Sequence, residues 1–344
     1  MTLQEASLNL TEEEYREYPC LSYSNLSKYD REGYESLETL FDPISTTSLA
    51  FGSLVDYLLT QSDKDITDKF AIVEAPTSPP FILNIVTELT KTCPEKQMAL
   101  ISDESILYVA DMMGYQTNWK SETRISKIRM LGSSDYNQIK SCENKIRITQ
   151  KDLDDAKSCI EALKSDPTTS WYFWSNPMTG TEALYQLQFV SRDMSTNIEF
   201  KGMLDLVLID HANKRIYPCD LKTTKSIYTF ENSFYTYRYY IQAAMYTQLL
   251  YDTIMNKCPE LSNYTIEPYR FIVISRATFK PIVFQWKVPT KSEHLKSPNG
   301  EPLSDWRDLL ERLTWDISNK DTKLPKPWYE NLKKNGFITI KRYL

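Results

Sequence analysis

Apolar and polar positions divide the chain into a helical first half and a second half rich in strands. From about residue 180 onward, apolar or partly alternating runs predict strands over residues 181–190, 198–210, 215–224, 269–277 and 280–288. A long run with helical spacing of apolar positions, residues 234–254, separates the third strand from the fourth. Strands, a helix and further strands predict an α/β fold, with a mixed central β-sheet flanked by helices.

Before residue 180 the apolar positions recur at helical spacing. They predict helices over residues 25–41, 45–63 and 149–166, and a further helix is predicted at 303–317, before a short final strand at 336–344. The proline-rich segment "APTSPPF" interrupts the pattern near residue 76. We therefore expect four parts, namely a helical N-terminal part, a helical insertion, a catalytic core, and a C-terminal helix and tail, over residues 1–75, 76–170, 171–290 and 291–344.

The second and third strands carry charged side chains inside apolar runs. The segment "HANK" between them is short enough to predict an antiparallel hairpin. Because side chains alternate along a strand, Asp220 and Lys222 point to one side, about 7 Å apart. Asp205, within the apolar run "GMLDLVL", can be placed opposite them. Burial of unpaired charges costs several kcal/mol, so this set is tolerable where it lines a cleft.

Two carboxylates with room for carbonyl and water ligands suit Mg²⁺ or Mn²⁺. A divalent cation there can polarise a phosphate, and a lysine beside it can orient an attacking water. An Asp-x-Lys pair alone would more often be a surface ion pair. Asp205 and the following helix favour a site, since that helix places Gln242 and Tyr246, four residues apart, on one face.

Composition narrows the classes further. The chain has 344 residues and a net charge of −6, which weighs weakly against DNA binding because a local basic groove is sufficient. Six scattered cysteines and two histidines argue against zinc and iron–sulfur sites, and 8 glycines form no phosphate-cradling motif. The acidic N-terminus and the absence of an apolar run of about 20 residues lead us to expect a cytoplasmic protein without membrane contact.

Three segments together resemble the PD-(D/E)XK nuclease superfamily. "GMLD", "DLKTT" and "YYIQAAMY" stand in the order and spacing of its RecB/RecE-like branch, which includes phage-type recombination exonucleases. "LSYSNLSKY" and "TSLAFGSLVDYLL" are similar to the opening helices of that branch. The resemblance covers residues 20–60 and 180–250. It implies a restriction-endonuclease-like core with helical N-terminal and inserted segments.

The resemblance also implies roles for individual residues. Gly52 and Asp56 match a Gly-x-x-x-His helix of the family, so Asp56 replaces a histidine; it could ligate metal, reflect altered or lost activity, or simply face outward. A further acid is expected on the preceding strand, where Glu182 is favoured over Glu199. The implied metal ligands are Asp205, Asp220, Glu182, the Leu221 carbonyl and Asp56; Lys222 positions the water; Gln242, Tyr246, Thr223 and Arg238 touch DNA, or the first two brace the site. Lys201 and Lys225 are further, weaker candidates for phosphate contact.

The implied function is a Mg²⁺- or Mn²⁺-dependent DNA exonuclease acting at double-stranded ends in recombination or repair. A single-strand annealing protein would be its partner, oligomers would be compatible with it, and a phage-encoded chain would work in the host cytoplasm. Two alternatives stay open on the same site: a structure-specific endonuclease and a catalytically silent DNA-binding relative. The motifs do not separate exonuclease from endonuclease, whereas Asp56 supports the silent relative and the intact set of Asp205, Asp220 and Lys222 argues against it.

Overall fold

The computed structural model describes residues 1–42, 47–60, 65–142, 145–176, 178–289 and 295–338. The chain divides into two compact units. The core unit contains residues 1–44 and 159–344, and the helical unit contains residues 45–158. The expected insertion was 76–170, so the helical unit begins earlier and ends earlier than the sequence pattern suggests. The expected four-part division itself stays a prediction.

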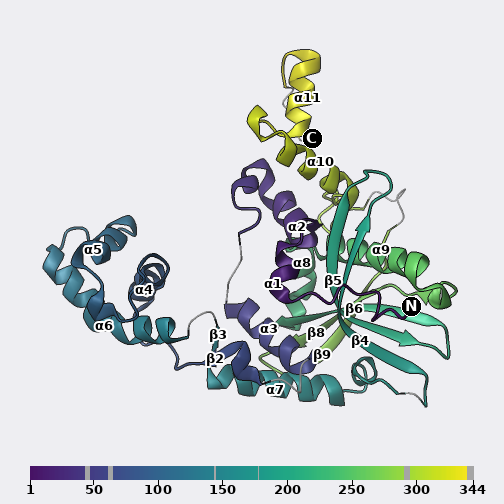
Figure 1. Cartoon of the computed structure of the whole chain (residues 1–344), viewed down its shortest axis with the longest axis horizontal. Helices are drawn as coiled ribbons and strands as arrows, with labels where there is room; N and C mark the ends of the chain where they lie inside the picture. Colours follow the sequence, from purple (N-terminus) through teal and green to yellow (C-terminus); the bar gives the residue numbers. More distant parts are fainter. Residues whose placement is uncertain (43–46, 61–64, 143–144, 177, 290–294, 339–344) are drawn as a thin grey trace. The chain divides into compact units, whose positions relative to one another are not determined.

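The core unit is built on a seven-stranded sheet (Figure 1). Its strands follow the order β1-β5-β6-β8-β9, with β4 also paired to β5 and β7 to β6. Strands β4–β5, β5–β6 and β8–β9 pair antiparallel, whereas β1–β5, β6–β7 and β6–β8 pair parallel, so the predicted mixed sheet is confirmed. The strands are β1 (Leu21–Ser22), β4 (Thr181–Arg192), β5 (Glu199–Asp210), β6 (Arg215–Thr224), β7 (Thr265–Ile266), β8 (Tyr269–Ser275) and β9 (Pro281–Trp286).

Helices cover the sheet through one shared apolar cluster. Buried side chains of α2, α9 and α10 join those of β4, β5, β6 and β8 in that cluster. A buried carboxylate ties two of these helices together, because Tyr29 on α2 donates a hydrogen bond to Asp316 on α10 at 2.5 Å. The helices of the core unit are α1 (Glu12–Glu17), α2 (Tyr23–Glu32), α8 (Phe230–Thr236), α9 (Tyr239–Lys257), α10 (Trp306–Ser318) and α11 (Lys326–Asn335), while α7 (Gln150–Ser165) crosses the division between the units.

Two predicted helices are shorter than expected. The N-terminal helix stops at Gly33, whose φ of 72° leaves the helical region, and a 3₁₀ turn follows over Gly33–Glu38. The helix predicted over 234–254 is two helices, because Arg238 adopts a left-handed conformation (φ 61°) between α8 and α9. Side-chain contacts hold that conformation, so the apolar spacing gives no sign of the break.

The helical unit has a core of its own. Helices α4, α5 and α6 bury an apolar cluster that includes Ile85, Val86, Leu89, Ile106 and Ile128. A two-stranded parallel sheet of β2 and β3 brings together segments that lie far apart in the sequence. Its elements are α3 (Thr47–Thr60), β2 (Phe70–Ile72), α4 (Pro80–Thr92), α5 (Asp103–Met112), α6 (Ser121–Ser141) and β3 (Ile146–Ile148).

No helix in the described ranges combines the length and apolar character needed to cross a membrane. The expected strand over residues 336–344 falls mostly outside the described residues, and α11 precedes it where the sequence pattern predicted no helix.

Candidate active site

The two predicted acids face each other where β5 and β6 separate. The ladder joins Leu206–Asp210 to Arg215–Cys219 and ends at the pair Leu206 and Cys219. One step further in the same register would set Asp205 opposite Asp220. Instead of a ladder bond, Asp205 Oδ2 accepts a hydrogen bond from the Leu221 N–H at 3.0 Å. We call this opening between β5 and β6 the fork.

The edge of β5 that pairs with β6 also lacks a complete strand partner before the fork. Strand β4 runs along one edge of β5, and β1 joins the opposite edge only at Phe200 and Lys201. Among the described residues, no strand pairs with that edge between β1 and β6, from Gly202 to Asp205. Helix α2 begins directly after β1, and its first residue, Tyr23, has its ring 6.4 Å from that of Tyr239, whose ring lies 4.8 Å from Lys222 Nζ.

The pairing of β4 with β5 is irregular at Asp205. On β4 the residue beside it is Gln186, whose φ of 53° lies in the left-handed region, and the regular pairs on either side are Tyr185–Leu206 and Leu187–Leu204. Leu204 and Val207, three residues apart, both lie in the apolar cluster, although strict alternation would put them on opposite faces. An irregularity of this kind is a common device for re-aiming one side chain of a sheet.

Lys222 forms an ion pair with Asp220 across one strand step. Its Nζ lies 2.5 Å from Asp220 Oδ2, and the side chains are 21% and 1% exposed. The ammonium also stands 4.8 Å from the centre of the Tyr239 ring, a cation–π distance. Burial lowers the pKa of Lys222, but the negative charge of Asp220 and smaller effects of Tyr239 and Asp205 outweigh it, so the pKa is raised.

Helix α9 braces Asp220 from the opposite side. Gln242 Nε2 donates a hydrogen bond to Asp220 Oδ1 at 2.5 Å, and both side chains are buried. Tyr246 lies one turn further along, buried, with its ring against Gly202 of β5. Burial is the main cause that raises the pKa of the Tyr246 hydroxyl well above its usual value. Of the two predicted roles for this pair, the geometry favours bracing over contact with DNA.

The donor atoms at the fork suit one hard divalent cation held mainly by Asp205 and Asp220. Asp220 Oδ2 is buried and close to Lys222, yet no donor meets it in hydrogen-bond geometry, and Gln242 Oε1 has no partner either. Within the described ranges, no three His, Cys, Asp or Glu side chains come together as a metal-binding group. Mg²⁺ is often bound by only one or two carboxylates, with water and substrate phosphate completing its shell. The bond recorded at Leu221 uses its N–H, and a role for its carbonyl stays a prediction.

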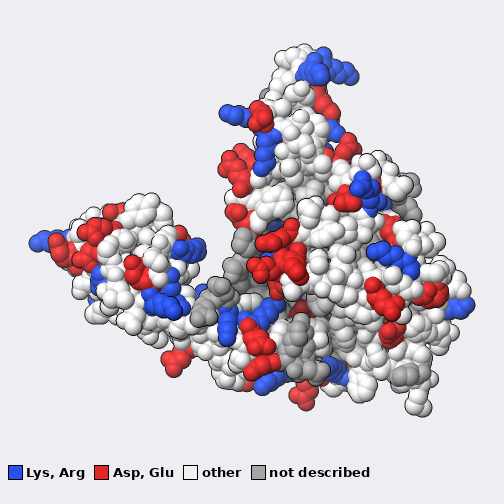
Figure 2. All heavy atoms as spheres, in the orientation of Figure 1, with Lys and Arg blue, Asp and Glu red and all other residues white. Residues whose placement is uncertain are grey.

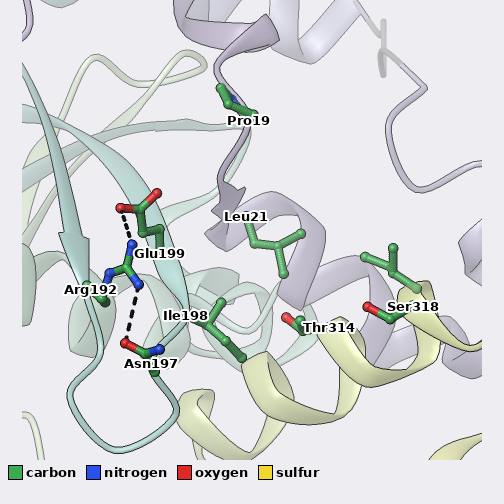
Figure 3. Close-up of a pocket in the computed structure, with 9 residues that line it drawn as sticks. Pro19, Leu21, Arg192, Asn197, Ile198, Glu199, Thr314 and Ser318 are labelled. Atoms are coloured by element: carbon green, nitrogen blue, oxygen red, sulfur yellow. Dashed lines mark hydrogen bonds and ion pairs between the residues drawn. The ribbon is translucent and has the colours of Figure 1, made fainter.

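The two acids proposed for the preceding strand do not join the fork. Glu182 pairs in register with Ile209, four residues from Asp205 and thus about 13 Å along the strand. It is half exposed and lies 3.3 Å from the His211 ring. Glu199, six residues before Asp205, lines a separate pocket, where it pairs with Arg192 at 2.9 Å (Figure 3). Placing Glu182 at the metal was therefore wrong in geometry.

Two basic side chains that were candidates for contact with DNA form hydrogen bonds within the protein instead. Arg238 binds Asp30 of α2 at 2.6 Å and the Tyr235 carbonyl at 2.7 Å, so it fixes the start of α9. Lys201 is buried, and its ammonium donates to the carbonyls of Tyr15, Arg16 and Tyr18 at 2.5, 3.0 and 2.8 Å. It therefore secures the end of α1 and has no donor left for a phosphate.

Thr223 lies next to the fork in sequence but on the opposite face of β6. Thr223 follows Lys222 on β6 and points to the other face of the sheet, while Lys225 is exposed after the strand. Asp56 lies on α3 of the helical unit, so its role toward the metal stays a prediction.

Sequence reasoning missed two tyrosines beside Lys222. Tyr239 precedes Gln242 by three residues and so shares its helix face, a spacing that could have revealed it. Tyr23 lies 6.4 Å from Tyr239, ring centre to ring centre, and its hydroxyl donates to the Tyr237 carbonyl at 2.6 Å. No local signal in the sequence links Tyr23 to a strand pair some 180 residues later.

Acidic and basic side chains are interspersed on the face of the core unit drawn in Figure 2. That face shows no continuous basic stripe of the kind that binds a long stretch of duplex.

Comparison with known proteins places this geometry in context. A family model described as a PDDEXK-like domain of unknown function (DUF3799) matches residues 21–276. No curated protein matches the chain. Among solved structures, one titled "Crystal structure of SSO0001" is 11% identical, covers 83% of this chain and 91% of that chain, and gives a TM-score of 0.25, too low to compare folds.

Proposed function

The chain belongs to the PDDEXK-like family and has its nuclease-type fold, and from this premise we propose that it is a Mg²⁺- or Mn²⁺-dependent DNA exonuclease acting at duplex ends. The observation that carries the proposal is the fork itself. There Asp205, Asp220 and Lys222 converge where β5 and β6 part, and Gln242 fixes one carboxylate from α9.

In the proposed reaction each residue of the fork has its own task. Asp205 and Asp220 hold the cation, which supplies Lewis-acid polarisation of the scissile phosphate when bound. Lys222, paired to Asp220, is held as an ammonium that donates hydrogen bonds. It therefore orients the attacking water and offsets the developing charge on the phosphate, and does not act as a general base. Gln242 keeps Asp220 in one orientation, which reduces the reorganisation needed on binding.

The narrower parts of the proposal come from the resemblance to the RecB/RecE-like branch. They are the preference for ends, a role in recombination or repair, and an annealing protein as partner. Two features support DNA as the substrate. The ammonium of Lys222 beside two carboxylates suits a phosphate bound through a metal ion, and the half-exposed ring of Tyr237 lies 5.8 Å from Tyr239, which contacts Lys222.

The direct test offers linear and covalently closed circular duplex DNA to the purified protein with Mg²⁺, Mn²⁺ or EDTA. We expect degradation of linear DNA only, dependent on the metal. Lys222→Ala and Asp220→Asn should each reduce the rate by about a hundredfold or more, because several kcal/mol of transition-state stabilisation are lost. Lys257→Ala, which changes the exposed lysine at the end of α9, 15 residues beyond Gln242, is the matched control and should retain full activity.

Other outcomes would replace the proposal. Cutting of circles would favour the structure-specific endonuclease, and binding of DNA without cleavage would favour a catalytically silent relative. Full activity of either fork variant would reject the assignment of the active site.

A further inference from the structure

A row of aromatic rings leads outward from the fork. Lys222 Nζ lies 4.8 Å from the centre of the Tyr239 ring, and the Tyr237 ring follows at 5.8 Å from Tyr239, tilted by 32°. Tyr239 is packed against Phe230 and Phe271, whereas Tyr237 is 50% exposed. Tyr237 is thus the outermost ring of the row and the one that a bound molecule can reach.

The backbone of Tyr237 is held in place although its ring is open. Its N–H donates to the Ser233 carbonyl at 2.9 Å. Its own carbonyl accepts two hydrogen bonds from α2, one from the Tyr23 hydroxyl at 2.6 Å and one from the Ser27 hydroxyl at 2.9 Å. The next residue, Arg238, is fixed by its ion pair with Asp30. Because its backbone is fixed, the half-exposed ring of Tyr237 would lose little conformational entropy when a flat molecule stacks on it.

An arginine of α2 lies beside the same row. Arg31 Nη1 donates a hydrogen bond to the Ser27 hydroxyl, which itself donates to the Tyr237 carbonyl. The Arg31 side chain is 28% exposed, and its ion pair with Glu32 is long, at 3.9 Å. An aromatic platform with an adjacent guanidinium offers a stacking surface for a base and a charge for the phosphate next to it.

We propose that Tyr237 stacks on an unpaired nucleobase of the strand whose backbone enters the fork. This inference rests on the proposed function and names a contact within it, namely a base next to the scissile phosphate. A stacked base would hold the strand in register while Asp205, Asp220 and Lys222 act on the phosphate. Stacking tolerates every base, because each has a π-face, so the contact fixes position without selecting sequence.

The test compares two single-stranded probes of equal charge, an oligothymidine of about 12 nucleotides and an abasic phosphodiester chain of the same length. Affinities are measured by fluorescence anisotropy in EDTA, so that no hydrolysis occurs. The wild-type protein should bind the oligothymidine about 5- to 100-fold more tightly than the abasic chain. Tyr237→Ala should bind both probes with the affinity that the wild type shows for the abasic chain, and Tyr237→Phe should behave as the wild type.

Tyr251→Ala is the matched control, since Tyr251 is also 50% exposed but lies nine residues beyond Gln242 on α9, about 13 Å along the helix. It should keep the preference for oligothymidine. The inference is overturned if Tyr237→Ala retains that preference, if it weakens both probes equally, or if the wild type binds neither. A protein that cuts no DNA but shows the tyrosine-dependent preference would refute the nuclease proposal alone, and cleavage without the preference would refute only the stacking contact.

Discussion

At the scale of single residues, the two carboxylates of the fork have different surroundings. Asp220 is buried between the ammonium of Lys222, with which it forms an ion pair, and the amide of Gln242, which donates a hydrogen bond to it. Asp205 is less buried, and the contact that defines its position is the N–H of Leu221. Replacement of each acid by its amide therefore has a different consequence, although both changes remove one negative charge.

We expect Asp220→Asn to destabilise the metal-free protein by about 1–3 kcal/mol, because the largely buried ammonium of Lys222 loses its counter-charge. Asp205→Asn should leave stability unchanged or raise it slightly. The amide oxygen can still accept from Leu221, and the repulsion between the two acids disappears. Chemical denaturation in EDTA measures both effects, with Lys225→Ala as the neutral control.

Repeating the melts with Mg²⁺ adds an independent check. Wild-type protein should gain stability as the cation binds the folded state, and both amide variants should lose most of that gain. If Asp220→Asn were as stable as the wild type in EDTA, the ion pair with Lys222 would not be the element that holds this carboxylate.

The fork acids could be predicted from the sequence because an unpaired charge buried in an apolar strand destabilises the fold, so such a charge is expected to be paired or to line a cleft. Alternation put Asp220 and Lys222 on one side, and a short hairpin brought Asp205 opposite them. Glu182 was proposed from the family resemblance alone, and the register sets it opposite Ile209, four residues from Asp205. The left-handed Gln186 beside Asp205 was not predicted either. A glutamine in that conformation is held by its neighbours and leaves no trace in the sequence.

At the scale of elements, the contact between β5 and α9 decides whether the fork group is assembled. Helix α9 supplies Tyr239, Gln242 and Tyr246, and its approach to β5 depends on Gly202. A Cβ atom at Gly202 would lie 2.5 Å from Leu249 and 2.6 Å from the Tyr246 ring. This supplies a physical reason for glycine three residues before the acid: any side chain would push the helix off the strand.

Gly202→Ala should therefore destabilise the protein by about 1–3 kcal/mol, the usual cost of an added group in a packed core. It should also lower nuclease activity at least tenfold, since a shifted α9 no longer presents Gln242 to Asp220. Denaturation curves and initial rates on linear duplex measure the two effects separately.

Gly132→Ala in the helical unit is a matched control. Its Cβ would lie 2.6 Å from Val86, so the local clash is similar, but neither residue belongs to the core unit. We expect comparable destabilisation and unchanged activity of the folded fraction. Loss of activity in this control and none in Gly202→Ala would contradict the role assigned to the strand–helix contact.

Element boundaries were predictable where apolar spacing alone determines them. The strands β4, β5, β6, β8 and β9 and the helices α7 and α10 were predicted from their patterns. The break between α8 and α9 was not, because it depends on Arg238 reaching Asp30 some 208 residues away in sequence. The parallel pair β2–β3 was also missed, because each strand has only three residues, too few to show an alternation of apolar and polar positions.

At the scale of the whole molecule, the fork belongs entirely to one compact unit. Asp205, Asp220, Lys222, Tyr239 and Gln242 all lie in the core unit, whose two chain segments contribute to a common apolar cluster. The helical unit has a separate cluster formed by α4, α5 and α6. The sequence pattern set the insertion at residues 76–170, whereas the compact unit spans residues 45–158, because the apolar spacing within α3 does not differ from that of a core helix.

This division leads to a prediction about substrate choice. We expect a variant in which a Gly/Ser linker of about 12 residues, spanning roughly 20 Å, replaces residues 45–158 to fold cooperatively, because residues 1–44 and 159–344 keep their common core. It should retain metal-dependent cleavage, since it keeps every fork residue. It should lose the preference for linear DNA and cut circles, since the fork residues act on a phosphate and do not themselves distinguish an end from an internal bond. Coincident transitions by circular dichroism and tyrosine fluorescence test folding, and the rates on linear and circular duplex test selectivity.

Asp220→Asn in the shortened chain excludes a contaminating nuclease. A folded, active variant that still spares circles would place the selection of ends within the core unit, and a variant that fails to fold would show that the two clusters are not independent.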